Sequence, residues 1–360
     1  MPTWGEELKE LHRLQATMAA KTSPSDPAPP SPFDVLRRTY LARLTELTGR
    51  AIIVYASAWL ETGRQFDSAQ VSVGLGDMQG FMEACSGVEE RELDLFLHSP
   101  GGSAEAAESI VEYLRTQFDH IRVIVPVAAM SAATMIALSA DEILMGAHSQ
   151  LGPIDPQFTI STPEGARSAP GQAILDQFEL AKAQCSTPAN IGAWLPILRS
   201  YAPGLIALCT HQREMAEACV AGWLERFMFK GEEAAKGTAG DAARWFADFQ
   251  KFQSHARRVS RDQCRELGLR VVDLEADQNL QEAVLSVFHA FQHTLSGTLT
   301  SKILENHHGR AWVQSAVPRM QVLQTPASAP PSAPRLASQA QSSPGPGNRA
   351  ARRQALRKGK

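Results

Sequence analysis

The first 145 residues alternate between two hydrophobic periods. Apolar side chains recur every three or four residues in five segments, which therefore predict amphipathic helices: 3–20, 32–48, 77–85, 104–118 and 131–139. Short, almost wholly apolar runs lie between these segments and have the length of strands covered on both faces: 51–56, 93–98, 121–126 and 142–145. Repeated alternation of this kind predicts an α/β domain with a largely parallel sheet.

After Gly146 the pattern becomes mostly helical. It predicts helices at 171–185, 203–229, 239–253, 260–266 and 279–304, and one final strand at 269–274. Proline and serine crowd a linker at 21–32, and the last residues are rich in Pro, Ser, Ala and Gln before they become basic. We therefore expect three parts, namely an N-terminal helix with its linker (1–32), one domain (33–315) and a disordered basic tail (316–360).

Charge is unevenly distributed along the 360 residues. The chain carries a formal charge of −3, but Thr325–Lys360 holds seven Lys/Arg and no Asp/Glu, so the remainder carries about −10. Such a tail could contact nucleic acid or anionic lipid. It contains no aromatic side chain on which bases could stack, so we interpret it as a flexible, solubilising segment.

Composition also indicates in which cellular compartment the protein is expected and whether it is expected to bind a metal or an organic cofactor. The five cysteines are odd in number and form no CxxC pair, which argues for reduced thiols rather than disulfides or a zinc site. The N-terminus has no apolar signal region, and the apolar window 123–140 is interrupted by Pro126 and by hydroxyl side chains. We expect a cytoplasmic protein with no membrane span and no metal or organic cofactor.

Two short segments carry candidate chemistry. Residues 95–102 run from a strand into a Gly101-Gly102 turn, and residues 127–134 place Ser131 among small side chains after another strand. Glycine N–H groups can face a developing oxyanion, and a serine at the start of a helix can act as a nucleophile. Together the two segments predict an acyl-transfer site of the serine-hydrolase kind.

Five segments in order also carry a family resemblance: His98–Gly102, Ala128–Ile143, Leu151–Gln157, Ser254–Asp262 with Leu267–Asp273, and Lys302–His307. They resemble the serine dehydrogenase proteinase family over roughly residues 33–315. That family is similar to Clp protease and signal peptide peptidase A, which have the Clp/crotonase fold. Its members are peptidases despite the name, and this chain accordingly has no GxGxxG after a strand.

The resemblance implies roles for particular residues. Ser131 would be the nucleophile, and the turn at Gly101 and Gly102 together with the Ala132 N–H would form the oxyanion hole. Clp protease has its histidine about 25 residues after the serine, but residues 152–156 contain none. Signal peptide peptidases use a lysine instead, and Lys182 follows Ser131 by 51 residues on an apolar helix. Burial there would lower its pKa and supply a neutral amine as the base.

Other interpretations remain open. His255 and His211 are alternative bases, whereas Asp155 fits a turn aspartate better than a residue that orients a base or substrate. His98 is expected to pack rather than react. The sequence favours a serine endopeptidase that acts on protein or peptide substrates through a Ser131 acyl-enzyme and assembles into homo-oligomers by analogy. A crotonase-type acyl-CoA enzyme and a catalytically silent scaffold are the alternatives.

Overall fold

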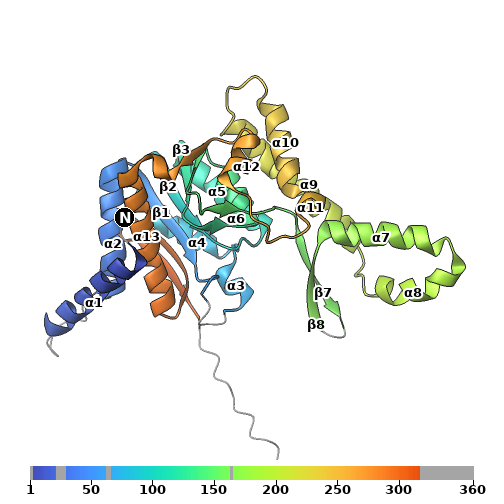
Figure 1. Cartoon of the computed structure of the whole chain (residues 1–360), viewed down its shortest axis with the longest axis horizontal. Coiled ribbons are helices and arrows are strands. Elements are labelled where there is room, and N and C mark those ends of the chain that lie inside the picture. The colour runs from blue at the N-terminus through green and yellow to red at the C-terminus, as the bar shows by residue number, and fades with distance from the viewer. Residues whose placement is uncertain (1–2, 22–29, 62–65, 163–164, 317–360) are drawn as a thin grey trace, which may run out of the picture. The chain divides into compact units, whose positions relative to one another are not determined.

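The structure is a computed structural model that describes residues 3–21, 30–61, 66–162 and 165–316 (Figure 1). All of them belong to one compact unit, Met1–Val317. The second unit, Pro318–Lys360, contains most of the predicted tail (316–360) and lies outside the described residues, as does most of the predicted linker.

A seven-stranded sheet forms the centre of this unit, in the order β11-β10-β1-β2-β3-β5-β9. Five strands are parallel to one another: β1 (Ala51–Ser57), β2 (Glu92–His98), β3 (His120–Val125), β5 (Glu142–Met145) and β9 (Val271–Asp273). Two antiparallel strands, β10 (Thr300–Asn306) and β11 (Ala311–Ser315), extend the sheet beside β1. This mainly parallel sheet, with a largely helical chain after residue 170, confirms the predicted α/β class.

Helices cover both faces of the sheet, so its parallel strands are buried on both sides. On one face, α2 (Pro32–Thr48) and α13 (Gln278–Gly297) pack on Ile52 and Val54 of β1 (Figure 1). The N-terminal helix α1 (Trp4–Lys21) packs on α2 and α13 in turn. Successive residues of a strand point to opposite faces, so Ile53 and Tyr55 belong to the other core.

That second core is formed by the helices between the strands and by part of the C-terminal region: α4 (Asp77–Cys85), α5 (Ala104–Gln117), α6 (Ala132–Leu138), α9 (Leu205–Arg226) and α10 (Ala235–Ala247). Ser103 caps the N-terminus of α5, because its hydroxyl accepts a hydrogen bond from the Ala106 N–H at 3.0 Å. The shorter elements are α3 (Ser68–Val71), β4 (Ala128–Ala129), β6 (Gln150–Leu151), α11 (Phe249–Phe252), α12 (Arg261–Glu266) and η1 (Leu274–Ala276).

The last two strands correct the sequence-based prediction, which extended a helix to residue 304. The helix α13 ends at Gly297, and residues 300–306 form β10, a strand with every residue buried. Lys302 and Glu305 interrupt the apolar run that would have indicated a buried strand. Each of these charged side chains is buried because it pairs with a residue far away in the sequence, Asp77 and Arg37 respectively. The hairpin of β7 (Gln157–Thr162) and β8 (Gly165–Pro170) was also not predicted.

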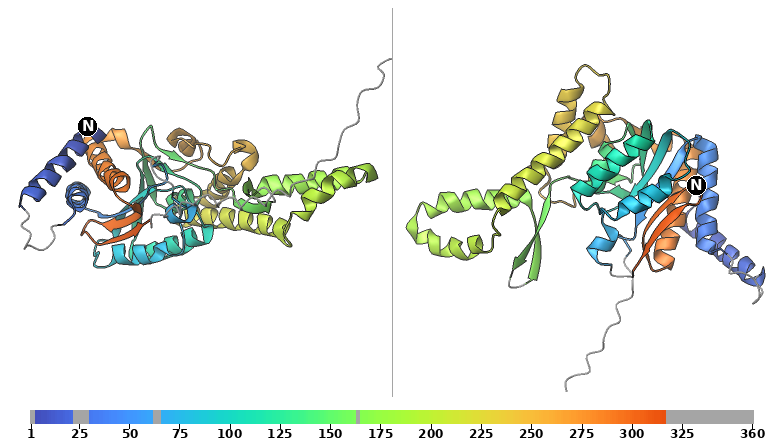
Figure 2. Two further views of the ribbon diagram at one scale, coloured as in Figure 1. Left: turned by 90° about the horizontal axis from the view of Figure 1, so that it is seen from below. Right: turned by 180° about the vertical axis from the view of Figure 1, so that it is seen from behind.

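A pair of helices extends away from the sheet next to that hairpin. Figure 2 shows α7 (Gly171–Cys185) and α8 (Pro188–Arg199) lying antiparallel to each other. The helix α8 buries none of its residues, and its apolar side chains are therefore left on the surface.

Two composition-based expectations concern the membrane and the thiols. Within the described residues, none of the helices combines the length and the hydropathy that crossing a bilayer requires. The apolar window 123–140 instead forms the end of β3, the short strand β4 and the helix α6. All five cysteines are free, and Cys85, Cys209 and Cys264 are buried.

An ion pair inside the protein fixes the loop between α3 and α4. The Lys302 ammonium on β10 donates to the Asp77 carboxylate at 2.7 Å and to the Ser72 carbonyl at 2.7 Å. Asp77 also accepts hydrogen bonds from the Tyr55 hydroxyl at 2.8 Å and from the Gly74 N–H at 3.0 Å. Burial, followed by the Asp77 charge, raises the pKa of Tyr55 well above its usual value, so its hydroxyl stays a donor.

Replacing Lys302 by methionine should therefore destabilise the protein by about 3–5 kcal/mol, because it leaves the Asp77 carboxylate buried without its cation. Urea denaturation of the wild type and of Lys302→Met measures this loss. The double variant Lys302→Met/Asp77→Asn should regain part of it. An effect no larger than that of Lys9→Met, which changes an exposed lysine, would contradict the assigned role.

Candidate active site

Backbone pairing beyond the end of β2 brings the Gly-Gly turn next to the Ser131 loop. The Ser99 N–H donates to the Ala128 carbonyl at 3.2 Å, and the Met130 N–H donates to the Ser99 carbonyl at 3.0 Å. The site thus lies at the carboxyl end of parallel strands, where open α/β sheets commonly bind ligands.

No side chain could fit at either glycine of this turn. A Cβ on Gly101 (φ 90°) would lie within 3 Å of the Met130 carbonyl oxygen, of the Ser131 Cβ (2.6 Å) and of the Ala132 nitrogen (2.8 Å). A Cβ on Gly102 would lie 2.6 Å from the nitrogen of Val73. The turn is therefore in direct backbone contact with the serine loop on one side and with Val73 on the other.

Val73 holds the turn by two hydrogen bonds. Its N–H donates to the Gly101 carbonyl at 2.7 Å, and its carbonyl accepts from the Ser103 N–H at 3.0 Å. Since Val73 follows Ser72, whose carbonyl accepts from Lys302, the buried ion pair supports the turn through one short loop.

Ser131 has an unusual backbone conformation. Its φ is 52° and its ψ is −121°, a region that non-glycine residues rarely adopt, with a typical cost of about 1–3 kcal/mol. Surrounding hydrogen bonds maintain it: the Met135 N–H donates to the Ser131 carbonyl at 3.0 Å, and the Thr134 hydroxyl donates to the Ala129 carbonyl at 2.7 Å. Strained residues of this kind cluster at active sites.

A cavity of about 320 Å³ opens at this serine. Its lining includes most of the residues under consideration: Gly101, Gly102, Ser131, Ala132, Gln157 and His255. Among the described residues, the N–H groups of Gly102 and Ala132 have no protein acceptor, whereas the Gly101 N–H donates to the Ser99 hydroxyl at 3.2 Å. The cavity thus combines a hydroxyl, two free N–H donors and an imidazole.

His255 reaches the cavity through a β-bridge that spans a long sequence separation. Leu151 and Val259 pair antiparallel, with both N–H groups bonded to the partner's carbonyl at 3.0 and 2.9 Å. Asp155 lies four residues after Leu151, and His255 lies four residues before Val259, so an antiparallel register puts them opposite each other.

The His255 Nδ1 lies 2.8 Å from the Asp155 Oδ1, and the Asp155 side chain is only 2% exposed. The other carboxylate oxygen accepts from the Gln157 side-chain amide at 2.7 Å. A carboxylate at Nδ1 places the ring proton on that nitrogen and leaves Nε2 as the proton acceptor. Asp155 was interpreted as a turn residue, and this pairing was missed because only the Leu151–Val259 bridge creates it.

The structure does not bring the other proposed bases to the cavity. The predicted burial of Lys182 is wrong: its side chain is 58% exposed and pairs with Glu179 at 2.8 Å. Neighbouring Ala181 faces the core instead, because adjacent residues of a helix point in different directions. His211 is exposed on α9, and it is the next residue, Gln212, that lines the cavity.

His98 packs as expected. Its ring lies 5.2 Å from the Phe288 ring and 5.8 Å from the Trp59 ring, and complete burial lowers its pKa to about 4. The imidazole is therefore neutral at pH 7 and belongs to the core.

Part of the chain matches the model of a known protein family. A model of the ClpP-like SDH-type serine proteinase family matches residues 82–168, which include Gly101, Ser131 and Asp155 but neither Lys182 nor His255. The match confirms the predicted resemblance over this segment, which is part of the range 33–315 for which it was predicted.

Two uncharacterized proteins of Methanocaldococcus jannaschii are 46% and 45% identical to this chain over 69 residues. That stretch is 19% of this chain and 24% of each relative, so the chain spans about a quarter of the length of the curated relatives it matches.

Two solved structures of a membrane-bound stomatin-specific protease are also similar. A serine-to-alanine mutant aligns with 60% of this chain and 79% of its own, at 15% identity and a TM-score of 0.35. A lysine-to-alanine mutant in complex with a substrate peptide aligns with 58% of this chain and 74% of its own, at 16% identity and a TM-score of 0.35. At this similarity no residue role transfers from them.

Proposed function

We propose that this protein is a serine endopeptidase that hydrolyses peptide bonds through an acyl-enzyme on Ser131. One observation carries the proposal: a strained serine and a histidine held by a buried carboxylate line the same cavity as free backbone N–H donors. The match of residues 82–168 to a serine proteinase family supports the reaction class.

In the proposed mechanism, the Ser131 hydroxyl attacks the scissile carbonyl while His255 Nε2 accepts its proton. Asp155 keeps the imidazole oriented and stabilises the imidazolium that forms. His255 then protonates the leaving amine, and a water molecule, activated by the same ring, hydrolyses the ester.

The carbonyl oxygen of the substrate gains negative charge during the attack, and hydrogen-bond donors stabilise that charge. The free N–H groups of Ala132 and Gly102 are available, and the Gly101 N–H joins them if it leaves the Ser99 hydroxyl. Each such donor typically contributes about 3 kcal/mol of transition-state stabilisation. The glycines and Ala132 thus keep the role that the resemblance implies, and only the base changes from Lys182 to His255.

The alternatives account for less of this geometry. A crotonase-type acyl-CoA enzyme uses paired N–H donors without a nucleophile, so it needs neither the strain at Ser131 nor a histidine–carboxylate pair. A silent scaffold needs none of these features. The substrate would be a protein or peptide, and the cytoplasmic location stays a prediction.

The nucleophile is tested by labelling with a fluorophosphonate, read by intact mass. The wild type should gain one adduct, because an activated serine attacks the phosphorus. Ser131→Ala should gain none, whereas Ser109→Ala, which removes an exposed hydroxyl on α5, should label like the wild type. A folded wild type that gains no adduct would contradict the proposal, and binding of a CoA thioester would then distinguish the acyl-CoA enzyme from the scaffold.

The base is tested by the rate constant of the same labelling reaction. His255→Ala should lower it by about 10²–10⁴-fold, the usual contribution of a general base, and Asp155→Asn should lower it substantially. Lys182→Ala should leave it within about twofold, since the lysine is exposed and pairs with Glu179 on its own helix. The reverse pattern, with loss in Lys182→Ala and normal labelling in His255→Ala, would restore the lysine as the base.

We further propose that the helix pair α7–α8 mediates self-association. Apolar side chains on this pair and on the start of α9 are 38–50% exposed: Leu180, Ile191, Leu195, Ile197 and Leu208. Contact with a second copy would remove this apolar surface from water.

Light scattering should therefore give a mass that is a multiple of the 39.1 kDa chain. Ile191→Ser/Leu195→Ser should reduce it without changing the circular dichroism spectrum. Leu299→Ser, at an exposed leucine away from this pair, is the control. A monomeric wild type, or an assembly that the double variant leaves intact, would show that this surface does not mediate association.

A further inference from the structure

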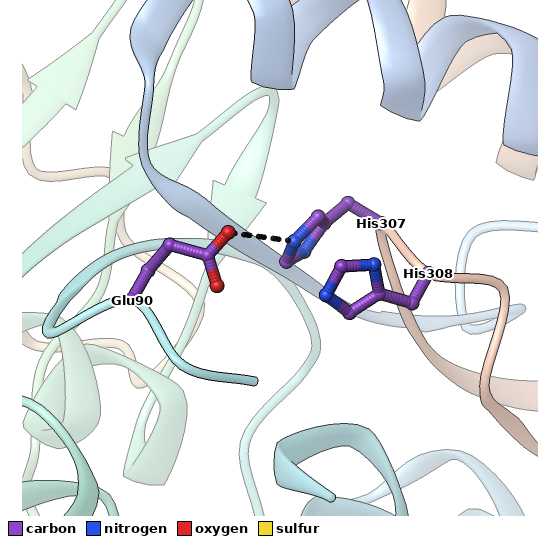
Figure 3. Close-up of side chains that lie close together, drawn as sticks. All are labelled: Glu90, His307 and His308. Atoms are coloured by element: carbon purple, nitrogen blue, oxygen red, sulfur yellow. Dashed lines mark ion pairs between the residues drawn. The ribbon is translucent and has the colours of Figure 1, made fainter. Parts of the chain in front are cut away.

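A cluster of potential metal-binding side chains lies at the opposite end of the sheet from the serine site. Glu90 precedes β2, and His307 and His308 follow β10, with one potential ligand atom of each within 4.8 Å of the others (Figure 3). The His307 N–H bonds to the Ile52 carbonyl near the start of β1. The cluster therefore lies at the amino end of the parallel strands, whereas Ser131 lies at their carboxyl end.

Its geometry suits a tetrahedral ion. The His307 Nε2 lies 3.4 Å from the Glu90 Oε1. Two ligands bound to one Zn²⁺ at about 2.1 Å each, at a tetrahedral angle, are about 3.4 Å apart. The His308 ring lies 4.0 Å from the His307 ring, centroid to centroid, and it is exposed, so its side chain can turn toward the same point.

Two polar atoms of the cluster are buried without a hydrogen-bond partner among the described residues, the His307 Nε2 and the Glu90 Oε2. The His307 side chain is only 4% exposed. A polar atom that is buried without a hydrogen bond normally lowers the stability of the folded protein. A proton on His307 would pair with Glu90 but would leave Glu90 Oε2 unpaired, whereas a metal ion could bind both residues.

The loop that carries the histidines is held in place before any ion binds. The Asn306 side-chain oxygen accepts from the His308 and Arg310 N–H groups at 3.0 Å each, and its amide donates to the Ala84 carbonyl at 2.8 Å. The other ring nitrogen of His307, Nδ1, lies 3.2 Å from the Ile52 nitrogen and 3.4 Å from the Ile52 carbonyl oxygen. With a proton on Nδ1 the ring donates to that carbonyl, and Nε2 keeps its lone pair for an ion. A backbone carbonyl at that position is a common outer partner of metal-binding histidines.

We propose that Glu90, His307 and His308 bind a divalent transition-metal ion, with Zn²⁺ the best fit, and that the ion joins the β10–β11 turn to the loop before β2. Two imidazoles and one carboxylate favour Zn²⁺ over Mg²⁺ and Ca²⁺, which take oxygen ligands. Three protein ligands leave a fourth position, open to solvent beside exposed His308, for water. The absence of CxxC motifs excluded a cysteine-based zinc site, and this site uses no cysteine.

The test is calorimetric titration of the full, tag-free chain with Zn²⁺ after treatment with a chelator. One ion should bind per chain, and the melting temperature should rise with Zn²⁺. His308→Ala and Glu90→Gln should each weaken binding at least tenfold and remove the thermal shift. His148→Ala, which removes an exposed histidine elsewhere, should bind like the wild type.

Several results would overturn the site: no saturable binding, equal affinity for Mg²⁺, or unchanged Zn²⁺ affinity in both ligand variants. Because His308 is exposed, His308→Ala should fold like the wild type, and its circular dichroism spectrum in the absence of metal checks this directly. Fluorophosphonate labelling of Ser131 is a separate measurement, so failure of one proposal leaves the other standing.

Discussion

The serine site depends on the close backbone contact of the Gly101-Gly102 turn with two neighbouring loops. On one side the turn touches the Ser131 loop, and on the other it is hydrogen-bonded to Val73 at 2.7 and 3.0 Å. Neither contact leaves room for a Cβ atom. Val73 in turn follows Ser72, whose carbonyl binds the buried ammonium of Lys302. A buried ion pair thus helps to position the proposed oxyanion donors, through the hydrogen bonds of Ser72 and Val73.

The strand β10 links the two halves of the core. Lys302 pairs with Asp77 at 2.7 Å, and Glu305 pairs with Arg37 of α2 at 2.6 Å. Their odd sequence separation places the two side chains on opposite faces of the strand. A slip of one residue would exchange the faces and leave both charges buried without partners, so these pairs specify the register of β10 as well as contributing to its stability.

The candidate base illustrates how distant segments meet in this fold. Lys182 lies in an apolar sequence, which suggested burial, yet its side chain points to solvent and toward Glu179. His255 follows Ser131 by more than a hundred residues and reaches the cavity through the bridge between Leu151 and Val259. That bridge also brings it to Asp155, so a single tertiary contact assembles the proposed histidine–carboxylate pair. The proposed residues then occur in the chain order Ser, Asp, His, as in the α/β-hydrolases.

The sequence by itself determined the features that depend on near neighbours. Hydrophobic periodicity predicted the longer helices and strands up to residue 145, but not the short elements α3 and β4. The SPGG turn and Ser131 could be recognised as candidate chemistry from local residue types. Tertiary structure alone decided that residues 300–306 form a strand, that Lys182 is exposed, and that His255 meets Asp155. The physical reason is the same in each case. A polar side chain is buried or exposed according to a partner far away in the chain, and local periodicity carries no information about that partner.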